Sequence, residues 1–192
     1  SIICSNMIKN DVQLGNCLDL MQNISSSSID AIIADLPYQQ TSQNKWDKLI
    51  PIEPLWKQYK RIIKEHGIIC LTGQGLFSAK MIIAAQDIYR YSLIWKKNKP
   101  RGFLNANKQP LRIHEDVLIF YKKQPIFNPQ KTTGHSPVHS YTKHTTDGSN
   151  YGKTKLEIKG GGSTERYPTS IVEIGVVNNE DKDKFHSTQK PV

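Results

Sequence analysis

Short runs of apolar residues alternate with amphipathic stretches in the first part of the chain. The run Ala31 to Ala34 includes two β-branched isoleucines and is too short for a buried helix, so it predicts a buried strand of the parallel type. Pro37 has no backbone N–H for a strand ladder and biases Leu36 toward extended geometry. We therefore expect the strand to end at Asp35, and the residues that follow to lie at its carboxyl end, where open α/β sheets bind ligands.

The segments that follow repeat the alternation of helix and strand. Apolar side chains recur at helical spacing over residues 54–65 and 77–86, whereas 68–72, 91–95 and 117–121 are short apolar runs typical of strands. We expect Gly67 to end the first helix, because glycine is the usual residue just past a helix C-terminus. Strand, helix, strand, helix, strand is the pattern of a parallel sheet with helices on its faces. The predicted fold class is therefore α/β, with helices on both faces of the sheet.

The composition changes after the last of these strands. From Pro125 to about Asn179 the chain is rich in Thr, Ser, Gly, His, Lys and Tyr, with few apolar runs, until an extended apolar stretch at 171–177. This composition favours a basic, hydrogen-bonding surface outside the main core. We therefore predict a core of residues 1–124, an inserted region of residues 125–179 and a return to the core over residues 180–192.

Positive charge is in excess and is locally concentrated. Lys and Arg number 26 against 17 Asp and Glu, a formal net charge of +9, which favours a polyanionic partner such as nucleic acid. The stretch 96–112 holds much of this charge, and we predict that Lys97, Lys99, Arg101 and Arg112 bind DNA phosphates. The alternative is a charged loop that only faces solvent.

Other classes of function find little support in the sequence. The cysteines Cys4, Cys17 and Cys70 have neither metal-ligand spacing nor an even count, so we expect reduced thiols of a cytoplasmic protein and no metal site. No apolar run approaches the roughly 20 residues of a membrane span, and no signal peptide is visible at the start.

Two motifs carry a resemblance to a known family. Asp35-Leu36-Pro37-Tyr38 resembles motif IV, usually Asp-Pro-Pro-Tyr, of the DNA amino-methyltransferases that modify adenine N6 or cytosine N4. His186-Ser187-Thr188-Gln189-Lys190-Pro191 resembles the family's His-Pro-Thr-Gln-Lys-Pro signature. The resemblance implies a Rossmann-like methyltransferase sheet, S-adenosylmethionine as cofactor and double-stranded DNA as partner. It also implies that residues 125–179 form a target-recognition region.

The same resemblance implies roles for individual residues. The exocyclic amine of a base is a weak nucleophile, and hydrogen-bond acceptors stabilise its reactive form. Asp35 and the backbone carbonyl of Leu36 would accept the two amine protons, Pro37 belongs to the same catalytic motif, and Tyr38 would stack on a flipped base. Asp35 would also line the cofactor site, together with Thr188, Gln189 and Lys190.

The resemblance leaves alternatives open. An aspartate in the first place of motif IV favours adenine N6, because cytosine-N4 enzymes more often have serine there; cytosine N4 remains the alternative. The chain stops at Val192, before the position of the family's glycine-rich Phe-x-Gly-x-Gly cofactor loop. We therefore expect either a fragment of a longer methyltransferase or a catalytically silent DNA-binding remnant. The oligomeric state stays open.

Overall fold

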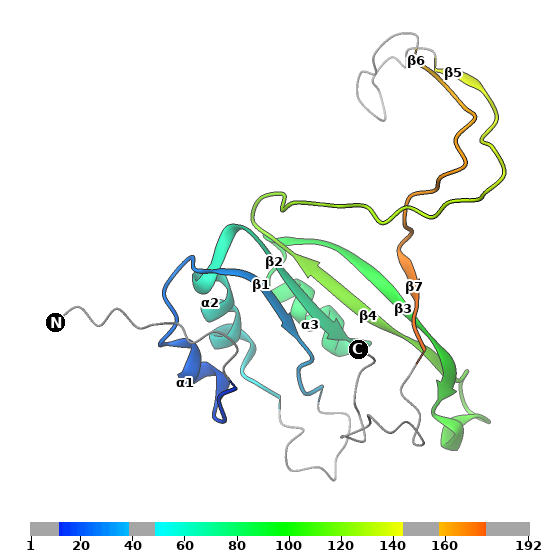
Figure 1. Cartoon of the computed structure of the whole chain (residues 1–192). Helices are drawn as coiled ribbons and strands as arrows, with labels where there is room; N and C mark the ends of the chain where they lie inside the picture. The colour runs from blue at the N-terminus through cyan, green and yellow to red at the C-terminus, as the bar shows by residue number, and fades with distance from the viewer. Residues whose placement is uncertain (1–11, 39–48, 144–157, 176–192) are drawn as a thin grey trace. The chain divides into compact units, whose positions relative to one another are not determined.

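The computed structural model of the chain describes residues 12–38, 49–143 and 158–175 (Figure 1). The chain divides into two compact units. The first contains residues 1–126 and 171–192, and the second contains residues 127–170. None of the helices in the described ranges is long and apolar enough to cross a membrane.

The first unit is built on a sheet of five strands in the order β1-β2-β4-β3-β7. Neighbouring strands are parallel at β1–β2 and at β3–β7, whereas β4 is antiparallel to both β2 and β3. The α/β prediction is confirmed, and the three strands predicted to form the parallel pattern, β1, β2 and β3, run in the same direction, whereas β4, for which no direction was predicted, inserts in reverse between β2 and β3. The strands are β1 (Ile29–Ala34), β2 (Ile63–Gly73), β3 (Tyr89–Arg101), β4 (Arg112–Phe120) and β7 (Ile171–Glu173).

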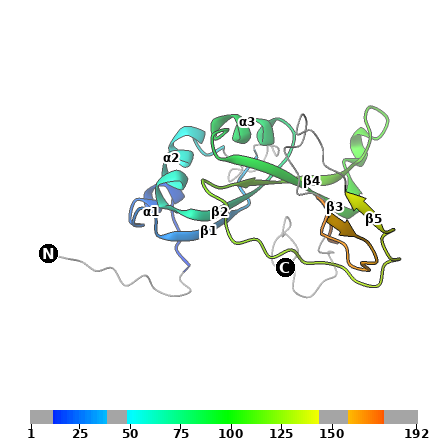
Figure 2. The same cartoon turned by 90° about the horizontal axis from the view of Figure 1, so that it is seen from above.

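Three helices accompany the sheet. α1 (Cys17–Met21) packs against α2 (Ile52–Ile62), and α2 packs against α3 (Leu76–Ala84). Figure 2 shows α2 and α3 on one side of the sheet. A helix on the opposite face, which the prediction included, is not found in the described part of the chain. A short 3-10 helix, η1 (Phe103–Asn105), lies between β3 and β4.

The core lies between the helices and the inner face of β2 and β4. Ile69 pairs with Phe120 and Leu71 with Leu118, and all four side chains are buried. In α2, the buried residues Leu55, Trp56, Tyr59 and Ile62 recur at the helical period that the sequence predicted. The carboxyl ends of β1 and β2 are thus held next to each other on a packed support.

Gly67 has a different role from the predicted helix stop. The helix ends at Ile62, and β2 begins directly at Ile63, so Gly67 lies inside the strand. A Cβ at this position would come within 2.7 Å of the Ile63 side chain and 2.9 Å of the Asp30 carbonyl oxygen. The register of β1 against β2 shifts at the same place, between Ile29 and Ala31. A glycine inside a strand often marks such a close approach of backbones.

The basic stretch 96–112 is also more regular than a loop. β3 continues beyond the predicted end at Trp95 to Arg101, and Arg112 already begins β4. The two strands pair from Tyr89–Phe120 through Lys96–His114 to Arg101–Arg112, with irregularities in the register. The predicted loop therefore includes the far end of a two-stranded arm, residues 96–101 and 112, and the connection between its strands.

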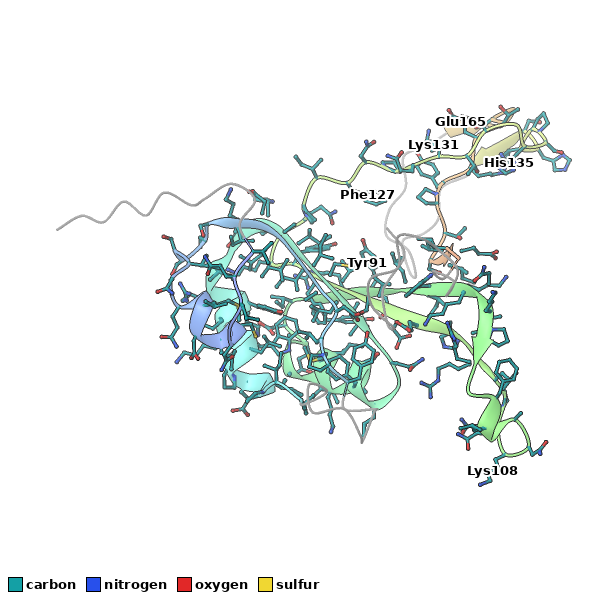
Figure 3. The ribbon with its side chains drawn as sticks, turned by 60° about the horizontal axis from the view of Figure 1, so that its bottom comes forward. Tyr91, Lys108, Phe127, Lys131, His135 and Glu165 are labelled. Atoms are coloured by element: carbon teal, nitrogen blue, oxygen red, sulfur yellow. The ribbon has the colours of Figure 1, made fainter. Side chains whose placement is uncertain are left out.

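The second unit contains β5 (Tyr141–Lys143) and β6 (Ile158–Gly160), which pair antiparallel. An isolated bridge joins Thr132 to Arg166. Lys131 and Glu165, labelled in Figure 3, form an ion pair with Nζ and Oε2 2.8 Å apart. The predicted role of residues 125–179 in target recognition stays a prediction.

Candidate functional site

The candidate site begins where β1 ends. Ala34 pairs with Leu71 across the parallel β1–β2 ladder, so the next residues, Asp35 and Thr72, come side by side at the strands' carboxyl ends. Asp35 is exposed, whereas Leu36 packs against the core and anchors the turn. β1 ends at Ala34, one residue before the predicted end, and the prediction of a buried strand is wrong, because none of its six residues is buried.

Asp35 is held by two hydroxyl groups. Its Oδ1 accepts a hydrogen bond from the Tyr38 hydroxyl at 2.9 Å and another from the Thr72 hydroxyl. The Tyr38 oxygen also lies 2.6 Å from Thr72 Oγ1. Because each hydroxyl has one proton, Thr72 donates to Asp35, and Tyr38 donates either to Asp35 or to Thr72.

Tyr38 acts as a neutral donor in this cluster. Burial is the largest cause that raises the pKa of the Tyr38 hydroxyl well above its usual value, and the nearby Asp35 charge raises it further. The Tyr38 ring packs against Phe77 with the ring centroids 4.8 Å apart. Hence Tyr38 keeps its proton at neutral pH, and its ring is anchored to α3. The stacking of Tyr38 on a base stays a prediction.

A cavity of about 380 Å³ adjoins Tyr38. Its walls include the apolar side chains of Leu49 and Phe77 and the cations of Lys80 and Arg112. Arg112 also donates to the side chain of Gln74, whose amide in turn donates to the His114 carbonyl at 3.1 Å. The structure thus brings one predicted DNA-binding residue, Arg112, to the same site as motif IV.

The other predicted DNA-binding residues are not equivalent. Lys97 forms an ion pair with Glu115 in which the side chains are only 13% and 11% exposed, and its ammonium group lies 4.8 Å from the Trp95 ring centroid. Lys99 and Arg101 are exposed on β3. A role for Lys97 in binding phosphate would therefore compete with its existing partner, whereas Lys99 and Arg101 face solvent.

Some of the predicted site residues lie outside the part of the chain that the structure describes, and two residues at the site were not predicted. Thr188, Gln189 and Lys190 lie outside the described residues. Thr72 and Lys80 were not predicted as site residues. The position of Thr72 at the end of a strand parallel to β1 is a signal that the sequence contained, whereas nothing in the local pattern marks Lys80.

The family model described as DNA methylase, of the N6/N4 type, matches residues 29–192. The chain belongs to this family, and the predicted resemblance is confirmed.

Individual relatives are more distant. The Type II methyltransferase M2.MboI of Moraxella bovis is 25% identical over 114 residues, covering 47% of this chain and 42% of that protein. The structure of the PvuII DNA methyltransferase, a cytosine-N4-specific enzyme, matches with a TM-score of 0.54 and 12% identity, over 88% of this chain and 58% of that one. A complex of M1.HpyAVI with SAM matches with a TM-score of 0.43 and 19% identity, over 60% of this chain and 55% of that one. This chain therefore spans about half the length of the proteins it matches, and the PvuII match supports the Rossmann-like fold.

Proposed function

We propose that the protein transfers a methyl group from S-adenosylmethionine to N6 of a flipped adenine in double-stranded DNA. The observation that carries this proposal is the Asp35 carboxylate at the carboxyl end of β1, with Oδ1 bound by Thr72 and Tyr38. In a member of the DNA methylase family, this carboxylate occupies the first place of the motif IV sequence.

Asp35 and the Leu36 carbonyl would accept the two protons of the target amine. As the nitrogen attacks, positive charge develops on it, and a carboxylate already oriented by two hydroxyls stabilises that charge without reorganising. Thr72 positions Asp35, because its hydroxyl donates to Oδ1 and limits the rotation of the carboxylate. Tyr38 contributes a neutral hydroxyl and an aromatic wall.

The described residues also fit the cofactor. S-adenosylmethionine supplies an electrophilic methyl carbon when it is bound, and its sulfonium centre is positive. The exposed negative charge of Asp35 is complementary to that centre. The adjoining cavity of about 380 Å³ is within the size range of small-molecule sites and has both apolar and polar walls. The residues predicted to complete the site, Thr188 to Lys190, lie outside the described residues.

The DNA would be held by cations near this cavity. Lys80 and Arg112 line the cavity beside Tyr38, and Lys99 and Arg101 are exposed on β3. Contacts of this kind position the duplex without reading its sequence. Unstacking the base has an energetic cost that contacts with the flipped base and the backbone can offset.

Cytosine N4 is the second candidate target. The PvuII enzyme, whose fold matches this chain, is cytosine-N4-specific. Both reactions methylate an exocyclic amine and would use the same acceptors. We favour adenine because the first residue of the motif is aspartate rather than serine.

Asp30, within β1, and Asp35, directly after it, provide a matched test of the enzyme proposal. Asp35→Ala should lower the rate of methyl transfer by about 10²- to 10³-fold, the range seen when one group that stabilises developing charge is removed. Asp30→Ala is the control, because Asp30 is exposed and pairs only on the surface with Lys64, at 2.7 Å. We expect Asp30→Ala to keep activity within about twofold.

A measurement of DNA binding distinguishes the enzyme proposal from a catalytically silent DNA-binding remnant. Both variants should retain salt-sensitive binding to duplex DNA, because neither removes a phosphate contact. Equal activity of Asp35→Ala and Asp30→Ala would contradict the role of Asp35. Full DNA binding by a protein that transfers no methyl group would favour the silent remnant.

A further inference from the structure

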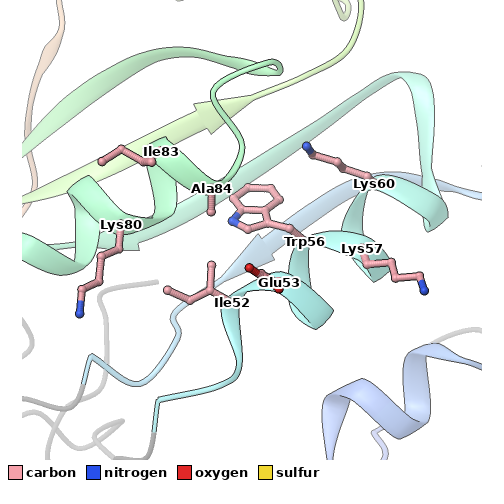
Figure 4. A pocket seen from close by; sticks show the side chains of 8 residues that line it. All are labelled: Ile52, Glu53, Trp56, Lys57, Lys60, Lys80, Ile83 and Ala84. Atoms are coloured by element: carbon pink, nitrogen blue, oxygen red, sulfur yellow. The ribbon is translucent and has the colours of Figure 1, made fainter.

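A second cavity lies between α2 and α3, and it shares Lys80 with the cavity beside Tyr38. It has a volume of about 640 Å³ and contains none of the predicted site residues (Figure 4). Ile52, Glu53, Trp56 and Lys57 line it from α2, and Ile83 lines it from α3. Its size and mostly apolar interior are typical of binding pockets.

The indole of Trp56 is an unusual element of this pocket. Trp56 is only 3% exposed, and its ring packs on Phe120 with the centroids 4.7 Å apart. Its Nε1 is buried and finds no hydrogen-bond acceptor among the described residues. By contrast, Trp95 Nε1 donates to the Ile174 carbonyl at 2.9 Å. Buried donors without acceptors are rare because they are costly, so an acceptor supplied by a bound ligand would remove this cost.

Three lysines and one carboxylate, that of Glu53, line the pocket, so its charged groups are mostly cationic. Lys57 and Lys80 make no hydrogen bond or ion pair within the part of the chain that the structure describes, and Lys60 pairs with Asp87 at 2.7 Å. In Figure 4 the three ammonium groups point away from one another, so one small anion would not reach them all. Ile83, which is 70% exposed, adds an apolar contact surface on α3.

We propose that this pocket binds an acidic, amphipathic peptide segment of a partner protein. An apolar side chain of the segment would pack on Trp56 and Ile83, and its carboxylates would pair with Lys57 and Lys80. A carbonyl or carboxylate oxygen would accept the Trp56 Nε1 proton. An extended segment suits the separated lysines, and the apolar interior favours a protein side chain over a phosphate backbone.

The test uses a peptide of alternating leucines and glutamates, which in extended form carries the leucines on one face and the glutamates on the other. During titration of the ¹⁵N-labelled chain, the indole N–H signal of Trp56 should move and saturate, whereas that of Trp95, already hydrogen-bonded to Ile174, should not. Trp56→Phe assigns the signal. A peptide of the same composition in scrambled order should bind at least about tenfold more weakly.

Charge variants test the lysine contacts. Lys80→Glu and Lys57→Glu should each weaken binding by about tenfold, and Ile83→Ser should weaken it to a similar extent. Lys64→Glu is the charge-matched control, because Lys64 lies on β2 and pairs with Asp30. The peptide affinity should stay within about twofold in this control. Ile83 and these lysines lie on the surface, so the variants should remain folded.

Three results would overturn the proposal. A Trp56 signal that does not respond to the peptide would show that its donor is not available to a ligand. Equal weakening by Lys64→Glu and Lys80→Glu would show that only net charge attracts the peptide. Displacement of the peptide by a DNA duplex that moves the same Trp56 signal would assign the pocket to DNA.

Discussion

At the scale of residues, the candidate site is a set of three side chains from two neighbouring strand ends. Asp35 and Tyr38 were predicted from motif IV, but Thr72 was not, although the residue ends a predicted strand. The pairing of Ala34 with Leu71 places Thr72 beside Asp35. Register between strands is a tertiary property, so a sequence pattern can identify each strand end without identifying which residues meet there.

Thr72 provides the sharpest residue-scale prediction. Thr72→Val keeps the shape of the side chain but removes the hydroxyl that donates to Asp35. We expect kcat for methyl transfer to fall by about ten- to a hundredfold, with little change in KM for DNA, because a misoriented group lowers the rate more than it weakens binding. Thr72→Ser restores the hydroxyl and should restore most of the rate. Single-turnover kinetics would compare the methyl-transfer rates of the two variants. Equal rates for Thr72→Val and Thr72→Ser would contradict the positioning role.

Tyr59 should make stability depend on alkaline pH. Burial raises the pKa of Tyr59 to about 12 from the usual value of 10.0. Between these values the unfolded chain loses the proton first, so the stabilisation is fully present below pH 10 and is lost as the pH rises toward 12. The full loss above both pKa values would amount to about 3 kcal/mol. Urea unfolding at pH 8 to 11 should show that the free energy of unfolding declines more steeply with pH in the wild type than in Tyr59→Phe. Identical declines would show that Tyr59 does not cause the pH dependence.

At the scale of elements, apolar periodicity predicted the helices and the positions of the strands, but not their ends or order. The apolar run that predicted β3 covers residues 91–95, yet the strand continues to Arg101. A half-exposed strand can carry lysines when its neighbour supports the backbone, as β4 does here. The antiparallel insertion of β4 between β2 and β3 depends on contacts far apart in sequence, which local patterns do not contain.

Gly67 tests the close approach of β1 and β2. Gly67→Ala would place a Cβ 2.9 Å from the Asp30 backbone oxygen, which cannot move without disturbing the ladder. We expect a loss of about 1–3 kcal/mol in the free energy of unfolding. Gly15→Ala is the control, because its Cβ would meet only the flexible Leu20 side chain, at 3.3 Å. Denaturant titration would measure the free energy of unfolding of both variants. Equal stability of Gly67→Ala and Gly15→Ala would contradict the crowding at Gly67.

The basic stretch 96–112 leads to a separate prediction for Lys97, Lys99 and Arg101. Lys99→Ala and Arg101→Ala should each lower the slope of log Kd against log salt by about 1 if the residue contacts a phosphate. Lys97→Ala should instead destabilise the fold, because it leaves the buried Glu115 without its ammonium partner. Salt-dependent DNA binding and thermal unfolding would separate the two effects. An unchanged salt slope for Lys99→Ala and Arg101→Ala would show that this arm faces away from DNA.

At the scale of the whole molecule, the chain combines an α/β sheet of the DNA methylase family with a motif IV sequence at the carboxyl end of β1. The five-stranded sheet, motif IV and the adjoining cavity are described, whereas the second predicted motif lies outside the described residues. The family could be inferred from two short motifs because their spacing and order are specific. The target base could not, because adenine and cytosine present the same exocyclic amine to the same acceptors.

The most direct test of the central claim is the identity of the methylated nucleoside. The intact protein would be incubated with duplex DNA and isotopically labelled S-adenosylmethionine, and the DNA would be digested to nucleosides for mass spectrometry. We predict labelled N6-methyladenine that disappears in Asp35→Ala and persists in Asp30→Ala. Labelled N4-methylcytosine would contradict the choice of adenine, and a product whose yield is unchanged by Asp35→Ala would contradict the catalytic site itself.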